Sequence, residues 1–311
     1  MDESRPDNWD DLIGETMGPD GRYTILRRVG EGGMGVVFLA EEKEKQRCIA
    51  VKILDPHGGI DTEALQRFKR EGRKFGILRH PNVVRVYGMG RAHGFLYIAS
   101  EFVDGKNLWE LVRDDGPMTI ERALHVVSDA ASGLQLAHDN GIIHRDLKPE
   151  NIMITSAEGV VKLLDFGIAK DLNASLALTV KGTYLGTPAY SSPEQIQGHV
   201  ITPQSDVFSL GVILYELVTG EVPFKGDKTV HVLLNTIKSK PICPTKLSEE
   251  VTRPVAKLIS RMIEKKPEKR PDGCAEVLKQ IADVQEILAK KSKGSERRFS
   301  GEILKQFFQK R

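Results

Sequence analysis

Two acidic side chains and an amide stand close together in the middle of the sequence, in a pattern that suits transfer of a phosphoryl group. Residues 144–151 read HRDLKPEN, and Asp-Phe-Gly follows at 165–167 after two short apolar runs. Phosphoryl transfer needs an acceptor for a hydroxyl proton and hard oxygen ligands for Mg²⁺. Asp146, Asn151 and Asp165 together match both needs, whereas the HRD turn alone would also be explained by a structural role.

A second segment has the composition of a phosphate-binding loop. Residues 30–37 read GEGGMGVV, and glycines allow backbone amides to approach phosphate oxygens closely. Taken alone, this pattern also fits a tight turn. Because β-branched residues follow the glycines directly, we expect the chain to return as a strand. That favours a hairpin over the strand-to-helix turn of a dinucleotide-binding fold.

A lysine lies inside an otherwise apolar run. Lys52 follows Ile49, Ala50 and Val51, and an unpaired ammonium there would be costly. Glu71 shares a helical face with Phe68 and Phe75, so it offers an anionic partner. Such a pair would hold the lysine where it can contact phosphates, and the alternative is two independent surface charges.

The elements that position these residues fall into two regions. Short β-branched runs over 23–54 predict an antiparallel sheet, and a helix is expected before His80, with further strands after it. Beyond Asp104-Gly105 the apolar spacing predicts helices near 107–114, 119–139, 203–219, 227–238, 252–264 and 273–289. A strand-rich half followed by a helix-rich half predicts an α+β protein of two lobes.

Composition excludes several classes of protein. The 311 residues, 40% of them hydrophobic, are enough for about two compact units. A net charge of +2 argues against a nucleic-acid partner, and three scattered cysteines favour a cytoplasmic location over a disulfide scaffold. No transmembrane segment is expected, because the best apolar run, 207–218, is short and contains Glu216.

Taken together, these motifs make the sequence resemble the eukaryotic-like (Hanks-type) protein serine/threonine kinases. The segments GEGGMG, FVDGKNL and SPEQ are most similar to the bacterial branch. The resemblance covers roughly residues 23–289 and implies the bilobal protein-kinase fold. The expected division is an acidic flexible segment over 1–22, a small antiparallel-sheet N-lobe with one main helix over 23–103, a larger, mainly helical C-lobe over 104–289, and a basic amphipathic tail over 290–311.

The resemblance also implies roles for individual residues. Asp146 would be the catalytic base, Lys148 would neutralise the transferring phosphate, and Asn151 and Asp165 would hold Mg²⁺, or Mn²⁺ in its place. Lys52 would contact the α- and β-phosphates of ATP, with Glu71 behind it. The other expected nucleotide contacts are Val29, Gly30, Glu31, Gly32, Gly33, Met34, Gly35, Val37, Ala50, Ser100 at the gatekeeper position, Glu101, Val103 and Met153. Glu194 would form a structural pair with Arg270.

Lys148 and the segment GTPAY at 186–190 resemble the Ser/Thr subgroup rather than the Tyr subgroup. This implies protein substrates with Ser/Thr hydroxyls, and autophosphorylation of the activation loop within a transient homodimer. The alternatives are a pseudokinase that binds nucleotide without transfer, and a small-molecule kinase of related fold. Catalysis is favoured because Lys52, Asp146, Asn151 and Asp165 are all present, and the GTPAY and SPE segments favour a protein substrate.

The basic tail allows three interpretations. Residues 290–311 hold eight basic and two acidic side chains, with an apolar stripe of Ile303, Leu304, Phe307 and Phe308. The stripe could pack on the catalytic domain, bind a partner, or lie on an anionic membrane surface. Residues 290–298 would also fit the basic stretch before the membrane helix of a longer receptor kinase, of which this chain would be a fragment.

Two glycines interrupt the helix that carries Glu71. Gly72 and Gly76 each cost about 0.8–1.0 kcal/mol relative to alanine in a helix interior. They either permit close packing or make the helix marginal, so that Glu71 moves in and out of the site.

We expect phosphorylation of Thr179 or Thr183 to order the segment between Asp165 and Glu194, because a dianionic phosphate can pair with Arg145. In a Thr179→Ala/Thr183→Ala double variant, kinase activity and the order of this segment, measured by limited proteolysis, should both fall. Full activity with an unchanged cleavage pattern would contradict the assignment.

Overall fold

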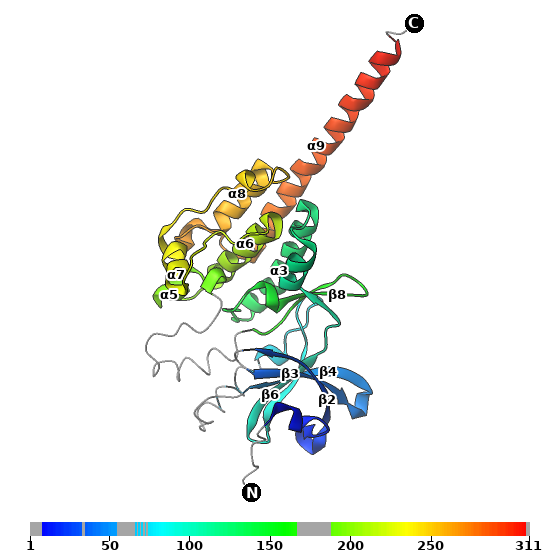
Figure 1. Ribbon diagram of the computed structural model, residues 1–311, viewed down its shortest axis with the longest axis vertical. Helices are drawn as coiled ribbons and strands as arrows, with labels where there is room; N and C mark the ends of the chain where they lie inside the picture. Colours follow the sequence, from blue (N-terminus) through cyan, green and yellow to red (C-terminus); the bar gives the residue numbers. More distant parts are fainter. Residues whose placement is uncertain are drawn as a thin grey trace. The chain divides into compact units, whose positions relative to one another are not determined.

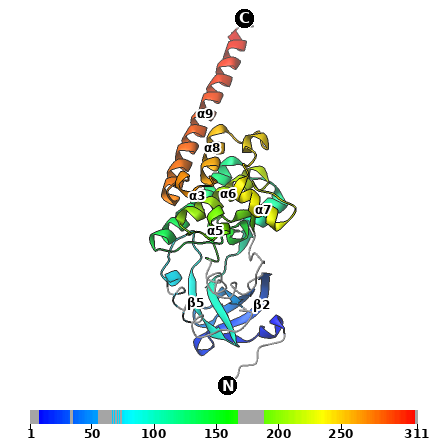
Figure 2. The ribbon, with the colours of Figure 1, turned by 90° about the vertical axis from the view of Figure 1, so that its left-hand side faces the viewer.

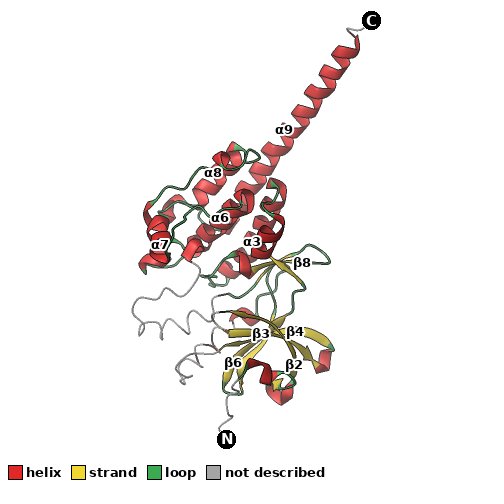
Figure 3. Ribbon diagram, in the orientation of Figure 1, coloured by secondary structure: helices red, strands yellow, loops and turns green. Residues whose placement is uncertain are grey.

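The computed structural model describes residues 8–32, 35–54, 66, 68, 70, 72, 74–166 and 188–308, with side chains as far as residue 291. The chain divides into two compact units. The first comprises Met1–Leu111 and Leu136–Thr187, and the second comprises Val112–Gln135 and Pro188–Arg311. The first is rich in strands and the second in helices (Figure 3). The HRD and DFG segments therefore belong to the strand-rich unit, although the sequence-based division assigned them to the helical lobe.

A six-stranded antiparallel sheet forms most of the first unit, in the order β1-β2-β3-β4-β6-β5 (Figure 1). The strands are β1 (Thr16–Met17), β2 (Tyr23–Gly32), β3 (Gly35–Glu42), β4 (Arg47–Leu54), β5 (Val86–Ala92) and β6 (Phe95–Glu101). Successive side chains of a strand point to opposite faces, and β3 alternates half-buried and buried residues along its length. One face accordingly holds a core that includes Phe38, Ile49, Val51 and Ile53.

The structure differs from the flexible segment predicted for residues 1–22. A 3-10 helix, η1 (Trp9–Leu12), is followed by β1, which pairs with β2, and by η2 (Pro19–Gly21). Leu12 and Met17 are buried in the sheet core, and the Trp9 ring lies 5.1 Å from that of Phe95. The prediction is wrong from residue 8 onward, because the acidic residues concealed three apolar side chains that pack on the core.

A second, three-stranded sheet precedes the DFG segment. It consists of β7 (Gly105–Asn107), β8 (Ile152–Thr155) and β9 (Val161–Leu163), and η4 (Pro149–Asn151) leads into β8. The main chain of residues 82–84 runs along β9: the Leu163 N–H donates to the Asn82 carbonyl and the Val84 N–H to the Leu163 carbonyl, each at 2.9 Å. β9 is therefore held on both sides.

The helix predicted to carry Glu71 is present at positions 66, 68, 70, 72 and 74–76. Glu71 itself lies outside the described residues. A Cβ added at Gly72 would lie 2.2 Å from the Met89 Sδ atom, whereas one added at Gly76 would meet nothing within 4 Å. At Gly72 the structure supports close packing against β5.

The second unit is mainly helical, and in it α6 packs against α8 and α9 (Figure 2). The longer helices are α2 (Leu108–Asp115), which spans the boundary between units, α3 (Ile120–Asp139), α5 (Pro193–Gln197), α6 (Pro203–Thr219), α7 (Thr229–Lys238), α8 (Arg253–Met262) and α9 (Cys274–Phe308). Short 3-10 turns are η3 (Lys43–Lys45) in the first unit, and η6 (Pro188–Tyr190), η7 (Pro244–Lys246) and η8 (Pro267–Lys269) in the second. α9 continues through most of the segment predicted as a separate tail. Within the described residues, no helix has both the length and the apolar character needed to cross a bilayer.

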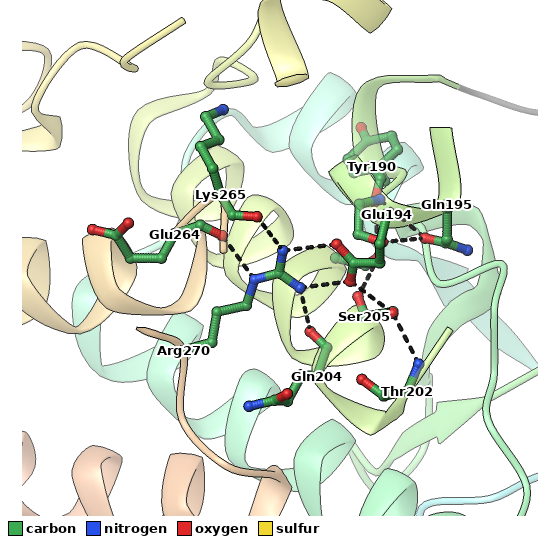
Figure 4. Close-up of polar contacts among 11 residues, drawn as sticks. Tyr190, Glu194, Gln195, Thr202, Gln204, Ser205, Glu264, Lys265 and Arg270 are labelled. Atoms are coloured by element: carbon green, nitrogen blue, oxygen red, sulfur yellow. Dashed lines mark hydrogen bonds and ion pairs between the residues drawn. The ribbon is translucent and has the colours of Figure 1, made fainter. Parts of the chain in front are cut away.

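A buried ion pair joins α5 to the segment after η8 (Figure 4). The Arg270 Nη1 and Nη2 atoms donate to the Glu194 Oε1 and Oε2 atoms at 2.7 and 2.8 Å, and both side chains are at most 5% exposed. Further hydrogen bonds satisfy the pair: the Ser205 hydroxyl donates to Glu194, and Arg270 donates to the carbonyls of Gln204, Glu264 and Lys265. The predicted Glu194–Arg270 pair is present.

We expect the Glu194–Arg270 pair to make stability depend on pH. Burial opposes ionisation of Glu194, yet the hydrogen bonds and charge of Arg270 hold the pKa of this carboxyl below its ordinary value of 4.5. Its stabilising contribution is therefore complete above pH 4.5 and is lost as the pH falls toward the lowered pKa. Urea unfolding followed from pH 7 downward should show this loss.

The Glu194→Gln variant should lose about 3–5 kcal/mol at pH 7, because it leaves the buried guanidinium unpaired. Its stability should also change less with pH over the acid range. Glu286→Gln, at an exposed position on α9, is the matched control. An identical acid profile for wild type and Glu194→Gln would refute the assignment.

Candidate active site

The glycine-rich segment is a hairpin, as its sequence predicted. β2 and β3 are antiparallel, and Gly32 pairs with Gly35 at the end of the ladder. Gly35 has φ of 139°, and a Cβ at this position would lie 1.9 Å from the Ile53 carbonyl oxygen. Only glycine therefore fits there. Gly33 and Met34, at the tip, lie outside the described residues.

The residues predicted to contact the nucleotide lie largely on the sheet face opposite the core. In the antiparallel register Val37 stands opposite Lys52, and Ala50 stands opposite Ser100. Directly opposed residues share a face, and these four alternate with the core residues of their strands. Val29 is the extra residue of a β-bulge in β2 and is 45% exposed. Gly30 and Glu31 lie in the same strand.

The remaining nucleotide candidates are spread over β6, its continuation and β8. Glu101 is the last residue of β6, Val103 follows it and is 9% exposed, and Met153 lies in β8. All three belong to the same unit as the hairpin. The strand and hairpin residues thus form one candidate surface for a nucleotide within the first unit.

Lys52 forms an ion pair with the aspartate of the DFG segment. Its Nζ atom lies 2.8 Å from the Asp165 Oδ2 atom, although 113 residues separate the two in sequence. Burial opposes ionisation of Asp165, but the charge and hydrogen bond of Lys52 hold the pKa of this carboxyl below its ordinary value of 3.8, with help from His144 and Lys148. Lys52 thus has an anionic partner other than the Glu71 predicted from the sequence, and Asp165 is ionised at neutral pH.

The HRD segment places its aspartate beside a lysine and an amide. The Lys148 Nζ atom lies 3.8 Å from the Asp146 Oδ2 atom. The Asn151 Nδ2 atom donates to the Asp146 carbonyl at 2.7 Å and approaches its Oδ2 atom at 3.4 Å. The Asn151 carbonyl in turn accepts from the Leu164 N–H at 2.9 Å. This chain of contacts ties the Asp146 turn to the residue that precedes Asp165.

Sequence reasoning missed the part played by His144. Its side chain is fully buried, its Nε2 atom donates to the Leu164 carbonyl at 2.8 Å, and its ring lies 4.6 Å from that of Phe166. Arg145 and Asp165 adopt positive φ values of 63° and 46°, which are uncommon for residues with a side chain. The HRD and DFG motifs were the available signal, but they did not show that the histidine joins them.

Asn151 and Asp165 have the chemistry expected of ligands for a hard divalent cation. Asp165 is ionised, as argued above. Because the Asn151 Nδ2 atom donates to Asp146, the Oδ1 atom is the one left to act as a ligand. Mg²⁺ prefers carboxylate and amide oxygens, so these residues fit the ion that the sequence implied.

Comparisons with known proteins agree with this arrangement. The protein kinase domain family matches residues 23–281. The probable serine/threonine-protein kinase CPE1738 of Clostridium perfringens is 40% identical over 248 residues, 80% of this chain and 36% of that protein. PknB of Mycobacterium leprae is 43% identical over 235 residues, 74% of this chain and 38% of its own. PrkC of Bacillus subtilis is 38% identical over 248 residues, covering 80% of this chain and 38% of PrkC.

Solved structures show the same fold. The kinase domain of Mycobacterium tuberculosis PknI superposes with a TM-score of 0.69 at 26% identity, over 87% of this chain and 97% of that domain. This confirms the expected α+β, bilobal kinase fold. The chain spans well under half the length of the curated relatives named above. On its sequence match and its fold, the chain belongs to the protein kinase family, within the eukaryotic-like serine/threonine kinases of bacteria.

Proposed function

We propose that the chain is an ATP-dependent protein serine/threonine kinase that also phosphorylates its own activation loop. The observation that carries the proposal is the arrangement of Lys52, Asp146, Lys148, Asn151 and Asp165, joined by short polar contacts within one unit. These are the residue types that phosphoryl transfer requires. The named serine/threonine kinases among the relatives support the choice of hydroxyl acceptor.

In the proposed reaction, the acceptor hydroxyl oxygen forms a bond to the γ-phosphorus of ATP. The bond from that phosphorus to the β,γ-bridging oxygen breaks, and ADP leaves. The hydroxyl proton passes to the Asp146 carboxylate, which is 15% exposed and faces Lys148. The Lys148 ammonium supplies positive charge beside the transferring group, where electrostatic stabilisation is most effective.

The other residues bind and orient ATP. Lys52 would contact the α- and β-phosphates, and the backbone amides of the glycine hairpin would cover the phosphates. Asn151 and Asp165 would hold Mg²⁺, which when bound neutralises charge on the phosphates. Thr179 and Thr183, the proposed phosphorylation sites, lie outside the described residues.

The adenine would lie on the apolar side chains of the sheet face. Val29, Val37, Ala50, Val103 and Met153 supply these side chains. Ser100 is small for the gatekeeper position, so we propose that it leaves space behind the adenine.

Three expectations extend beyond the site. They are a cytoplasmic location, a transient homodimer during autophosphorylation, and contact of 290–311 with an anionic membrane surface. The observations made here support none of them over its alternatives, and they stay predictions from the sequence.

We expect Asp146→Asn to lower transfer of ³²P from ATP to a generic basic protein by about 10²–10⁴-fold, because it removes the proton acceptor. ATP binding should be retained. Asp283→Asn, at an exposed position on α9, is the matched control and should transfer normally. A wild-type protein that binds ATP without transfer would be a pseudokinase, and transfer by Asp146→Asn at the wild-type rate would exclude Asp146 as the base.

A further inference from the structure

The carboxylate of Glu101 is held on both of its oxygens at the end of β6. Its Oε1 atom lies 2.7 Å from the Lys162 Nζ atom, and its Oε2 atom accepts the Arg85 N–H at 3.2 Å. The Glu101 main chain is fixed as well, because its N–H donates to the Arg85 carbonyl at 2.8 Å. Both the backbone and the side chain of this residue are therefore restrained.

Lys162 is mounted on a strand that is itself anchored. It is the middle residue of β9, between Val161, whose carbonyl accepts the Asn82 Nδ2 atom at 2.9 Å, and Leu163, whose N–H donates to the Asn82 carbonyl at 2.9 Å. Asn82 is 7% exposed. Across the sheet Lys162 pairs with Met153, one of the proposed adenine contacts. Two residues after β9 the chain reaches Asp165.

The pair is better shielded from water than an ordinary surface pair. The Lys162 and Glu101 side chains are 15% and 27% exposed, whereas Lys225 and Glu221, also 2.7 Å apart, are 57% and 44% exposed. Shielding strengthens the attraction between charges and makes a lone charge more costly to leave. Exposed pairs contribute little. The Glu101–Lys162 pair can therefore restrain the two strands, and the surface pair serves as its control.

We propose that Glu101 and Lys162 are positioning residues that hold the adenine-binding end of β6 in a fixed relation to β9 and so set the affinity for ATP. The proposal rests on the proposed function, in which the backbone near Glu101 and Val103 receives the adenine and Asp165 holds the metal ion. Neither side chain takes part in phosphoryl transfer. Breaking the pair should weaken nucleotide binding and leave the chemical step nearly unchanged.

The test compares Glu101→Gln, Lys162→Met, the double variant, Lys162→Arg and the control Lys225→Met. The dissociation constant for ATP with Mg²⁺ is measured by titration calorimetry, and kcat and KM are measured with a generic basic protein. Each single variant should raise Kd and KM for ATP by about tenfold, with kcat within about twofold. The double variant should match the singles, because the second change removes nothing further. Lys162→Arg and Lys225→Met should bind ATP as the wild type does.

An unchanged Kd in both single variants would overturn the proposal. So would additive losses in the double variant, or a raised kcat with unchanged Kd, which would show that the pair restrains turnover instead. Glu101→Gln keeps the shape of the side chain and its bond from Arg85, so it decides the matter if Lys162→Met does not fold. A folded wild-type protein that fails to bind ATP would refute the proposed function itself, which is a different result.

Discussion

An ammonium group in an otherwise apolar strand must meet an anion, and the arrangement of the first unit follows from that requirement. Lys52 points to the face of the sheet opposite the core, where it meets Asp165 at 2.8 Å. The pair lowers the pKa of the aspartate and keeps it ionised. An ionised Asp165 can hold a cation, and a lysine fixed beside it can hold phosphates. One contact thus prepares both halves of the proposed site.

The contact is useful only if the strands that carry it are fixed. Lys52 lies in β4, between β3 and β6, and Asp165 follows β9, which hydrogen bonds fasten to Asn82 and to β8. His144 and Asn151 bind the residue just before Asp165. These supports come from segments far apart in sequence. They tie the catalytic turn, the metal-binding residues and the hinge strand to one framework.

The parts that the sequence could predict are those with local patterns. Alternating β-branched residues indicated β2–β4, and the glycine hairpin followed from the valines after it. The partner of Lys52 could not be found in this way, because periodicity indicates a face and not which anion lies there. Met17 was hidden among acidic neighbours, and the Glu101–Lys162 pair depends on a register that no single segment encodes. Glu71 lies outside the described residues, so its pairing with Lys52 stays a prediction.

The affinity of the Asp165→Asn variant for ATP, measured by calorimetry with and without Mg²⁺, tests the central claim most directly. If Asp165 acts by holding the cation while Lys52 binds the phosphates, the substitution should weaken ATP binding in the presence of Mg²⁺ by about tenfold or more and leave binding without Mg²⁺ nearly unchanged. Equal affinity of variant and wild type in the presence of Mg²⁺ would contradict the account.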